Sequence, residues 1–396
     1  MNNIETRSIQ PFYRDTYIEV NLDAIHHNIR EYRRWIGDQV ILLVTVKANA
    51  YGHGMVPIAK AATEAGVDRL GVAFVDEGIQ LRKAGITIPI LVLGYTPPHA
   101  IQAAVQYDLA ITVYSSYLLE QVQEEAKRQN KKATIHIKLD TGMGRLGIQP
   151  SEVIPFLHQA AQYSAIYVEG LYTHFSTADE KERSYFDKQI KGFEQMREVV
   201  KEAGFEIPIY HSSNSAATMV EKTQHHQMVR VGVGLYGMYP SDEVSHSDLN
   251  LIPALRLVTK VSHLKKVSAD HGISYGKTYT TQGDEWLATL PIGYADGYSR
   301  SLSNKGFVLL NGVRVPVVGT VCMDQLVVRV DEAMPVQVGD EAVVYGMQGG
   351  EEIRVDEVAK WLGTINYEVT CMLQRRIPRI YTYQGKVIEV VNGLMQ

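Results

Sequence analysis

Eight short apolar runs between residues 40 and 239 constrain the fold more than any other feature of the sequence. Each run has roughly four to eight residues and is rich in β-branched side chains. A nearly continuous apolar run of this length is typical of a strand that is buried on both faces, as in a parallel sheet. The runs are residues 40–46 and the segments that begin at Arg69, Pro89, Leu109, Ala133, Ile166, Ile207 and His226.

Helical segments separate these runs. The clearest spans residues 183–203, where apolar side chains such as Phe186 and Phe193 recur every three or four positions and Gly204 provides a stop. Strands that alternate with helices in this way predict an α/β fold, a (β/α)8 TIM-like barrel. An open doubly wound sheet uses the same repeat with fewer strands and is the alternative. The other expected helices are residues 56–65, 100–107 and 116–129.

The pattern changes near residue 250. Beyond it, apolar and polar residues alternate between Gly and Pro, and one helix is expected, at residues 355–362. This pattern is typical of a β-rich domain. We therefore predict a barrel domain over residues 1–250, which ends in a linker at 241–250, and a β-rich domain over residues 251–396.

Composition and charge disfavour several classes of protein. Asp and Glu number 44 against 39 Lys and Arg, and this net charge of −5 argues against a nucleic-acid partner. Cys322 and Cys371 form no redox or zinc motif, so we expect no metal site and a reduced, cytoplasmic protein. The first twenty residues lack the apolar core of a signal peptide. Gly and Pro interrupt the charge-free stretch 84–107, so no membrane span is expected either.

Two segments match the G-x-G-x-x-G pattern of dinucleotide-binding loops, residues 142–147 and 232–237. In such a loop the last glycine opens a helix. Pro150 follows the first match closely and Pro240 follows the second, so neither can continue as that helix. We exclude a dinucleotide site on this ground.

Polar residues follow the predicted barrel strands at their C-terminal ends, where barrel enzymes hold their active sites. Lys47 ends the first apolar run. Desolvation there should lower the pKa of its amine and leave it nucleophilic. A lysine whose ammonium reaches solvent at the barrel rim is the alternative.

The later strands end in further cationic and small polar groups. Ser215 follows the seventh strand and the glycines Gly232 and Gly234 follow the eighth, which is where barrels often bind phosphate. A reactive lysine opposite an anion site is what pyridoxal phosphate requires. Single members could also have structural roles, such as a helix cap or a core histidine. The remaining residues at these ends are Lys138, Asp140, Arg145, His174, Asn214 and Arg230.

Motifs along nearly the whole chain resemble those of the alanine racemases. They include VKANAYGHG at 46–54, DTGMGRLG at 140–147, ISYG at 273–276 and CMDQ at 322–325. The resemblance implies a fold-type III enzyme, in which residues 1–21 pack on the C-terminal domain. It also implies a homodimer that uses pyridoxal 5'-phosphate to interconvert L- and D-alanine, and so supplies D-alanine for cell-wall peptidoglycan.

The same resemblance implies roles for individual residues. Lys47 would be the Schiff-base lysine, and Tyr275 from the partner subunit would be the opposing base. Arg230 would lie at the pyridine nitrogen and leave it unprotonated, because an arginine does not readily release its proton. The other implied cofactor-binding residues are Tyr51, His174, Asn214, Ser215, Gly232, Val233 and Tyr367.

The substrate side is implied in the same way. Arg145 and the partner's Met323 would approach the substrate carboxylate, and Tyr294 would line the entrance. A tyrosine base needs nearby positive charge to act near neutral pH, and His174 and Arg145 are the candidates. Lys138 matches a position that can be carbamylated, and an ion pair with Asp140 is its alternative.

Three other functions stay open at this point. A racemase for a larger or polar amino acid is the most serious, because Thr320 and Thr370 depart from the common family pattern near the expected entrance. A fold-type III decarboxylase is disfavoured by Arg230 and by the lack of a triple-glycine phosphate loop. A non-enzymatic pyridoxal-phosphate carrier resembles the barrel alone and would not need residues 251–396.

Overall fold

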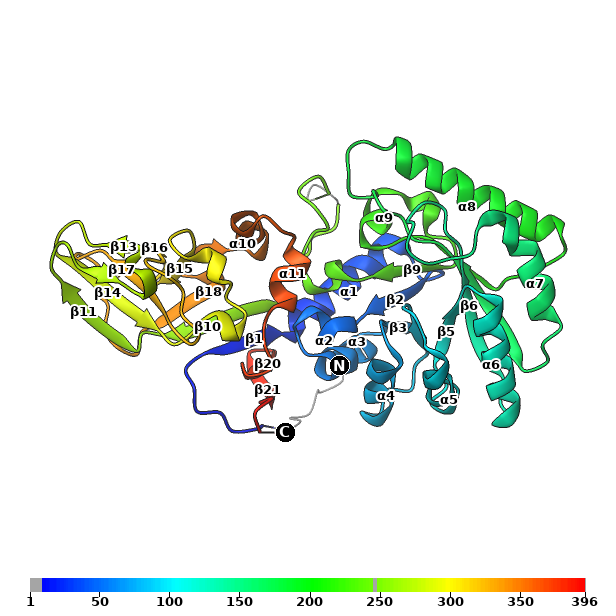
Figure 1. Cartoon of the computed structure of the whole chain (residues 1–396), viewed down its shortest axis with the longest axis horizontal. Helices are drawn as coiled ribbons and strands as arrows, with labels where there is room; N and C mark the ends of the chain where they lie inside the picture. Colours follow the sequence, from blue (N-terminus) through cyan, green and yellow to red (C-terminus); the bar gives the residue numbers. More distant parts are fainter. Residues whose placement is uncertain (1–8, 245–247, 396) are drawn as a thin grey trace. The chain divides into compact units, whose positions relative to one another are not determined.

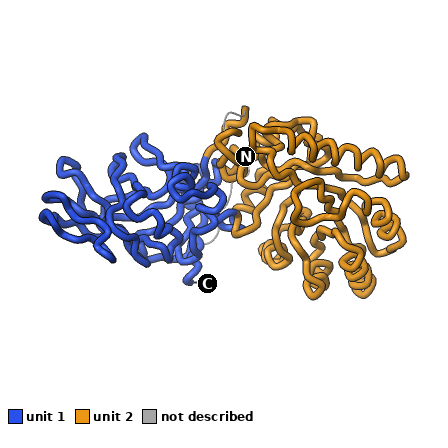
Figure 2. Tube along the Cα trace, turned by 45° about the horizontal axis from the view of Figure 1, so that its top comes forward, with its two compact units in different colours: residues 1–24, 51–57, 253–396 blue, residues 25–50, 58–252 orange. Residues whose placement is uncertain are grey.

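The computed structural model describes residues 9–244 and 248–395. The chain divides into two compact units, which Figure 2 colours separately. Unit 2 holds residues 25–50 and 58–252, and unit 1 holds the residues up to Ala24, residues 51–57 and the residues from Pro253 onward. None of the helices within the described ranges is long and apolar enough to cross a membrane.

Unit 2 is built on eight parallel strands in the order β8-β7-β6-β5-β4-β3-β2-β9. Figure 1 labels β2, β3, β5, β6 and β9 of this sheet, together with the helices of the unit. The strand β2 comes first in sequence among the barrel strands, and it pairs with both β3 and β9, the last barrel strand. The amide of Arg230 donates to Ser213 O at 3.0 Å and closes the ring between β8 and β9. The predicted barrel is confirmed, and an open sheet is excluded. The strands are β2 (Ile41–Thr45), β3 (Arg69–Val72), β4 (Ile90–Val92), β5 (Ala110–Val113), β6 (Ala133–Lys138), β7 (Ile166–Tyr172), β8 (Ile209–His211) and β9 (Met228–Val231).

Helices connect these strands. The four predicted helices correspond to α3, α5, α6 and α8, while α4 and α7 had no residue-level prediction. A core cluster that includes Leu43, Leu91 and Met228 fills part of the barrel interior. The helices are α1 (Leu22–Ile36), α2 (Lys47–Tyr51), α3 (Met55–Glu64), α4 (Val75–Lys83), α5 (Pro98–Gln106), α6 (Ser116–Arg128), α7 (Val153–Ala161), α8 (Ser184–Glu202) and α9 (Ser215–Val220), with short 3-10 turns η1 (Pro150–Glu152), η2 (Lys222–Gln224) and η3 (Val233–Tyr236).

Unit 1 is dominated by β-strands. Its main sheet has the order β16-β15-β18-β10-β1-β20-β21, with β19 paired to β18. The strands of this sheet are β1 (Tyr17–Asn21), β10 (Leu255–Lys260), β15 (Phe307–Leu310), β16 (Val313–Pro316), β18 (Glu341–Gln348), β19 (Glu351–Ile353), β20 (Arg379–Tyr383) and β21 (Lys386–Val391). The smaller sheets contain β11 (His263–Val267), β12 (Gly272–Ile273), β13 (Tyr279–Thr280), β14 (Glu285–Leu290) and β17 (Leu326–Val330).

The N-terminal strand β1 belongs to this sheet although the barrel follows it in sequence. It pairs antiparallel with β10 and parallel with β20. Residues 17–21 therefore lie against the C-terminal strands. The expectation that residues 1–21 pack on the C-terminal domain also covers residues 1–8, which lie outside the described residues. Residues 245–247 of the predicted linker lie outside them as well.

Among the described residues from Pro253 onward there are two helices, so the expectation of a single helix was wrong. The predicted one is α10 (Val355–Leu362), and the second is α11 (Asn366–Cys371). Its six residues are too few to show helical periodicity, and Val369 and Thr370 have β-branched side chains that disfavour a helix. Both are buried, so packing within the unit stabilises α11. The remaining 3-10 turns of the unit are η4 (Tyr275–Lys277), η5 (Tyr294–Asp296) and η6 (Arg300–Leu302).

Candidate active site

Lys47 follows the C-terminal end of β2 and begins a turn of left-handed helix. The next residues, Ala48, Asn49 and Ala50, have φ of 52°, 54° and 54° and ψ of 50°, 43° and 51°. The amide of Ala48 donates to Glu77 Oε1 at 2.7 Å. Each non-glycine residue in this region costs roughly 1–2 kcal/mol. Such strain is typical of functional sites, and here it turns the chain immediately after the lysine.

Cationic groups gather around Lys138, the last residue of β6. The side chain is 3% exposed, and burial followed by the charge of Arg230 lowers its pKa to about 8. Arg145 and Lys47 act in the same direction. The structure thus brings three other predicted cations, Arg230, Arg145 and Lys47, into electrostatic range of Lys138.

Lys138 forms no ion pair with Asp140 in the structure. The Asp140 carboxylate instead accepts hydrogen bonds from the amides of Gly142 and Gly144, both at 3.0 Å. The Lys138 ammonium lies over the Tyr172 ring, 5.6 Å from its centroid. The ion-pair alternative for Lys138 is therefore not what the structure contains.

Arg230, on β9, is buried among hydrogen-bond acceptors. Its Nη1 donates to His211 Nδ1 at 2.8 Å, and its Nη2 donates to Thr173 O at 2.9 Å. Burial lowers the pKa of Arg230 to about 10, so the guanidinium remains charged at neutral pH.

His174 receives a hydrogen bond from Arg230 Nη2 at its Nδ1 atom, at 3.2 Å. Burial, and then the charges of Arg230 and Lys138, hold the pKa of His174 well below its usual value. The imidazole is neutral at pH 7. Burial and the cationic neighbours thus disfavour the form of His174 that would supply positive charge to a tyrosine base, and Arg145 is the other candidate for that role.

The loops after β8 and β9 are joined by a hydrogen bond from the Gly232 amide to Ser215 Oγ, at 2.8 Å. The Asn214 side chain accepts from the Ala217 amide at 3.0 Å and so caps α9. Val233 begins the turn η3, where the first amides have no partner within the turn. The structure therefore gives the Asn214 side chain and the Gly232 amide partners within these two loops.

Two of the predicted phosphate ligands lie in unit 1. The rings of Tyr51 and Tyr367 are 6.1 Å apart between centroids. Gly52, next to Tyr51, has no room for a side chain, since a Cβ there would lie 2.0 Å from Thr370 O. The backbone of α11 thus packs directly on the residue that follows Tyr51.

The three residues expected to line a neighbouring active site share one loop region of unit 1, and all are exposed. Tyr275 is 74% exposed, Met323 53% and Tyr294 41%. The Tyr294 amide donates to Cys322 O at 3.0 Å, and Ser274 Oγ lies 3.3 Å from Cys322 Sγ. The structure thus brings the segments that carry these three residues next to one another.

Two family descriptions match most of the chain. Residues 20–240 match "Alanine racemase, N-terminal domain" and residues 254–381 match "Alanine racemase, C-terminal domain". The chain belongs to the alanine racemase family.

Individual alanine racemases resemble the chain over nearly its full length. "Alanine racemase 2" of Caldanaerobacter subterraneus subsp. tengcongensis is 45% identical over 96% of this chain and 98% of its own. The alanine racemase of Symbiobacterium thermophilum is 46% identical over 93% and 97%. The crystal structure of the Bacillus anthracis alanine racemase with bound L-Ala-P has a TM-score of 0.93 and 45% identity, covering 98% of this chain and 100% of that one.

The family membership identifies the activity. The chain is an isomerase that interconverts the enantiomers of alanine, and its family uses pyridoxal 5'-phosphate. The relatives match both units, which argues against a cofactor carrier built from the barrel alone, and they bear the racemase name rather than that of a decarboxylase.

Four residues in the barrel of this alanine racemase were missed by the sequence analysis. His211 Nε2 lies 2.9 Å from His136 Nδ1, and His136 Nε2 lies 2.9 Å from Glu169 Oε2. Arg69 forms an ion pair with Glu169 at 2.6 Å. A signal was present, because His136 and Glu169 interrupt otherwise apolar strands, where an ionisable side chain must point into a polar site.

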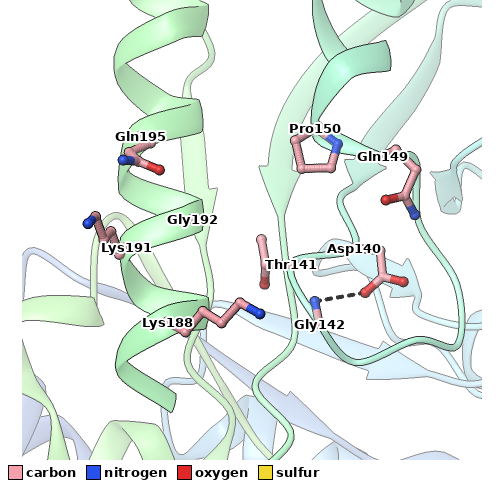
Figure 3. A pocket seen from close by; sticks show the side chains of 9 residues that line it. All are labelled: Asp140, Thr141, Gly142, Gln149, Pro150, Lys188, Lys191, Gly192 and Gln195. Atoms are coloured by element: carbon pink, nitrogen blue, oxygen red, sulfur yellow. Dashed lines mark hydrogen bonds between the residues drawn. The ribbon is translucent and has the colours of Figure 1, made fainter. Parts of the chain in front are cut away.

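A hollow of about 420 Å³ lies between α8 and the loop after β6 (Figure 3). Asp140, Thr141 and Lys188 line it, and Gly192 of α8 faces Thr141 across it. Of the predicted site residues, only Asp140 contributes to this hollow. None of the four cations Lys47, Lys138, Arg145 and Arg230 lines it.

Proposed function

We propose that this alanine racemase holds pyridoxal 5'-phosphate in the barrel and exchanges the α-proton of alanine between two bases, Lys47 and Tyr275. The observation that supports it best is the cluster of Lys47, Lys138, Arg145 and Arg230 at the C-terminal ends of the strands. Four cations in one place suit a ligand that carries a phosphate, a phenolic oxygen and a carboxylate.

The donors of Arg230 fit the cofactor ring. An arginine has five N–H groups, and in the described chain those of Arg230 that form hydrogen bonds belong to Nη1 and Nη2. Its Nε–H is therefore available to an acceptor such as a pyridine nitrogen. Arg230 would leave that nitrogen unprotonated, since its pKa of about 10 is far above that of pyridine-type bases.

The loops after β8 and β9 fit the phosphate. Ser215 Oγ fixes the two loops to each other, and the amides that begin η3 are free of partners within their turn. Backbone amides at the start of a helical turn bind anions. Ser215, Gly232 and Val233 would hold the phosphate, and the contacts expected from Tyr51 and Tyr367 stay a prediction.

The bound cofactor would withdraw electron density from the substrate and acidify its α C–H bond. Lys47 Nζ would take or return the proton on one face, and Tyr275 Oη would do so on the other. Two fixed bases are needed because a single base would have to cross the substrate. Arg145 would neutralise the substrate carboxylate and favour the phenolate form of the tyrosine.

The partner is a second copy of the chain. Tyr275, Met323 and Tyr294 are exposed together, as residues that complete a neighbouring site would be. We also propose a cytoplasmic role in D-alanine supply for peptidoglycan. The two cysteines of the sequence form no redox or zinc motif, which is compatible with a reducing compartment.

Borohydride reduction followed by peptide mapping tests the site. The reagent would fix the cofactor on Lys47, and a label on any other lysine would refute the assignment. Chiral chromatography after incubation with L-alanine measures the activity, and the same assay with larger and polar amino acids measures substrate breadth. Activity with one of those and none with alanine would favour the broader racemase instead.

A further inference from the structure

Arg230 is a buried cation without a carboxylate next to it. Its side chain is 4% exposed, and across the residues that the structure describes no carboxylate oxygen lies within ion-pair distance of it. A buried charge without a counter-charge is costly. Its hydrogen-bond partners are carbonyl oxygens and two neutral imidazoles.

A chain of hydrogen bonds connects Arg230 to the carboxylate of Glu169 through the barrel interior. The steps are Arg230 Nη1 to His211 Nδ1 at 2.8 Å, His211 Nε2 to His136 Nδ1 at 2.9 Å, and His136 Nε2 to Glu169 Oε2 at 2.9 Å. Both imidazoles are fully buried. Each ring uses both of its nitrogens, so the chain is continuous.

The direction of every bond in this chain follows from its two ends. An arginine only donates, so His211 Nδ1 must accept. A neutral His211 then carries its proton on Nε2 and donates to His136 Nδ1. His136 in turn carries its proton on Nε2 and donates to Glu169, which as a carboxylate only accepts. No other arrangement of neutral imidazoles satisfies all three bonds.

Both rings are neutral in this environment. Burial lowers the pKa of His136 and holds that of His211 well below the usual value, and the charge of Arg230 acts in the same direction. Burial opposes ionisation of Glu169, but hydrogen bonds from His136 and Arg69 outweigh it and lower the pKa to about 2. The chain therefore has a cation at one end, an anion at the other and polarisable neutral rings between them.

The surrounding residues are shaped to hold this chain. Gly170 makes room for the His136 ring, because a Cβ at that position would lie 2.2 Å from His136 Nδ1. The register of the β6–β7 pair shifts between Ile135 and His136. Tyr172 stacks on His211 with ring centroids 4.5 Å apart and an angle of 8° between the planes.

We propose that Glu169 is the counter-charge of Arg230, and that Glu169, His136 and His211 are positioning residues that hold Arg230 charged and aimed at the cofactor. This rests on the proposed role of Arg230 at the cofactor ring. Hydrogen-bonded groups in a low-dielectric interior polarise one another, so the carboxylate acts over the whole chain rather than at its first bond. Arg69 competes for the same carboxylate, since it forms two hydrogen bonds with it.

Nitrogen NMR of the holoenzyme labelled in its histidine rings tests the arrangement without reference to activity. The expected result is an unprotonated Nδ1 and a protonated Nε2 in both His136 and His211, with signals assigned by single histidine variants. A proton on Nδ1 of either ring, or an imidazolium at His136, would overturn the proposal. This measurement needs no variant of Glu169 to fold.

The pH profile of kcat/KM tests the counter-charge. Glu169→Gln keeps an acceptor oxygen and removes the negative charge that favours the cationic form of Arg230. The pH at which activity falls on the alkaline side should therefore decrease by up to about one unit. This is the size expected for two charges on the order of 10 Å apart. Arg69→Met breaks the same ion pair but removes a positive charge. The pH of the alkaline limb should therefore stay the same or increase. Glu19→Gln, which breaks an ion pair with Arg256 in unit 1, is the matched control and should leave the limb unchanged.

A purely structural ion pair predicts a different pattern. Glu169→Gln and Arg69→Met would then change the alkaline limb of the kcat/KM profile in the same way. Shifts of this limb with the same sign in both variants, or no shift in either, would refute the proposal. Failure of the proposed cofactor site is distinguishable, because borohydride labelling away from Lys47 would refute that site while the ring protonation measured by NMR would be unaffected.

Discussion

The hydroxyl of Thr320 donates a 2.8 Å hydrogen bond to the carbonyl oxygen of Tyr275. Thr278 Oγ1 lies 3.0 Å from the same hydroxyl, and because the Thr320 proton is used, Thr278 is the donor there. Thr320 is buried, at 6% exposed. Thr320, one of the two residues singled out near the expected entrance, thus holds the backbone of the proposed base.

This contact gives a first prediction. Thr320→Val removes the hydrogen bond at nearly constant volume and should lower kcat several-fold, since one such bond contributes about 1 kcal/mol. Thr320→Ser retains the hydroxyl and should preserve most of the rate. Steady-state kinetics with both enantiomers of alanine measure the effect, and equal rates for valine and serine variants would contradict it.

Lys138 gives a prediction for how the free energy of unfolding depends on pH. Its pKa in the folded chain is about 8 and the ordinary value is 10.5, so between these values the unfolded chain binds a proton that the folded chain has released. Stability should therefore rise with pH across this window, by at most about 3 kcal/mol. Urea unfolding at several pH values measures the slope, and Lys138→Met should abolish it.

The same experiment reports on carbamylation. A carbamylated Lys138 has no ammonium to titrate, so the rise between pH 8 and 10.5 should disappear when bicarbonate is added and return when it is removed. Intact-protein mass spectrometry identifies the adduct. A slope that is insensitive to bicarbonate would show that the lysine stays a free amine.

Ser215 gives a prediction for cofactor affinity. Ser215→Ala removes the acceptor of the Gly232 amide and should weaken pyridoxal-phosphate binding by roughly tenfold, the effect of about 1.4 kcal/mol. Ser213→Ala is the matched control, because its hydroxyl is also buried but donates to Gln224 O at 2.7 Å. Fluorescence titration of the two apoproteins compares them. A larger loss in the Ser213 variant would refute the assignment of the phosphate to Ser215.

The left-handed turn after Lys47 gives a prediction with opposite signs at two alanines. Ala48→Gly relieves strain of roughly 1–2 kcal/mol and should leave stability unchanged or increase it. Ala103→Gly, in the ordinary helix α5, should lower stability by about 1 kcal/mol. Ala48→Val should be more destabilising than either, since a β-branched residue is disfavoured at positive φ. Thermal unfolding of the three variants provides the measurement.

The barrel could be predicted from sequence because its strands are apolar on both faces. The helix α8 was equally clear, since its apolar side chains repeat regularly and Gly204 ends it. The left-handed turn could not be predicted, because none of Ala48, Asn49 and Ala50 is a glycine. Tertiary contacts, among them the hydrogen bond from the Ala48 amide to Glu77, stabilise this conformation against the local preference of its residues.

The candidate site was partly accessible to the same reasoning. Placement at strand ends was enough to single out Lys47, Lys138 and Arg230. Tyr275 followed from the resemblance alone, because position in an irregular loop carries no periodic signal. The lowered pKa of His174 depends first on its burial and then on proximity to cations that are far away in sequence, and neither can be read from local sequence.

The chain of imidazoles has a consequence for engineering this enzyme. Replacing buried polar side chains by aliphatic ones is a common route to greater thermal robustness. In this barrel, such a redesign at His136 or Glu169 would remove groups that reach Arg230 only through His211, and on the proposal above it would still lower the activity. Stabilising substitutions are better placed on the outer helices, where they would not interrupt the hydrogen bonds that connect Glu169 to Arg230.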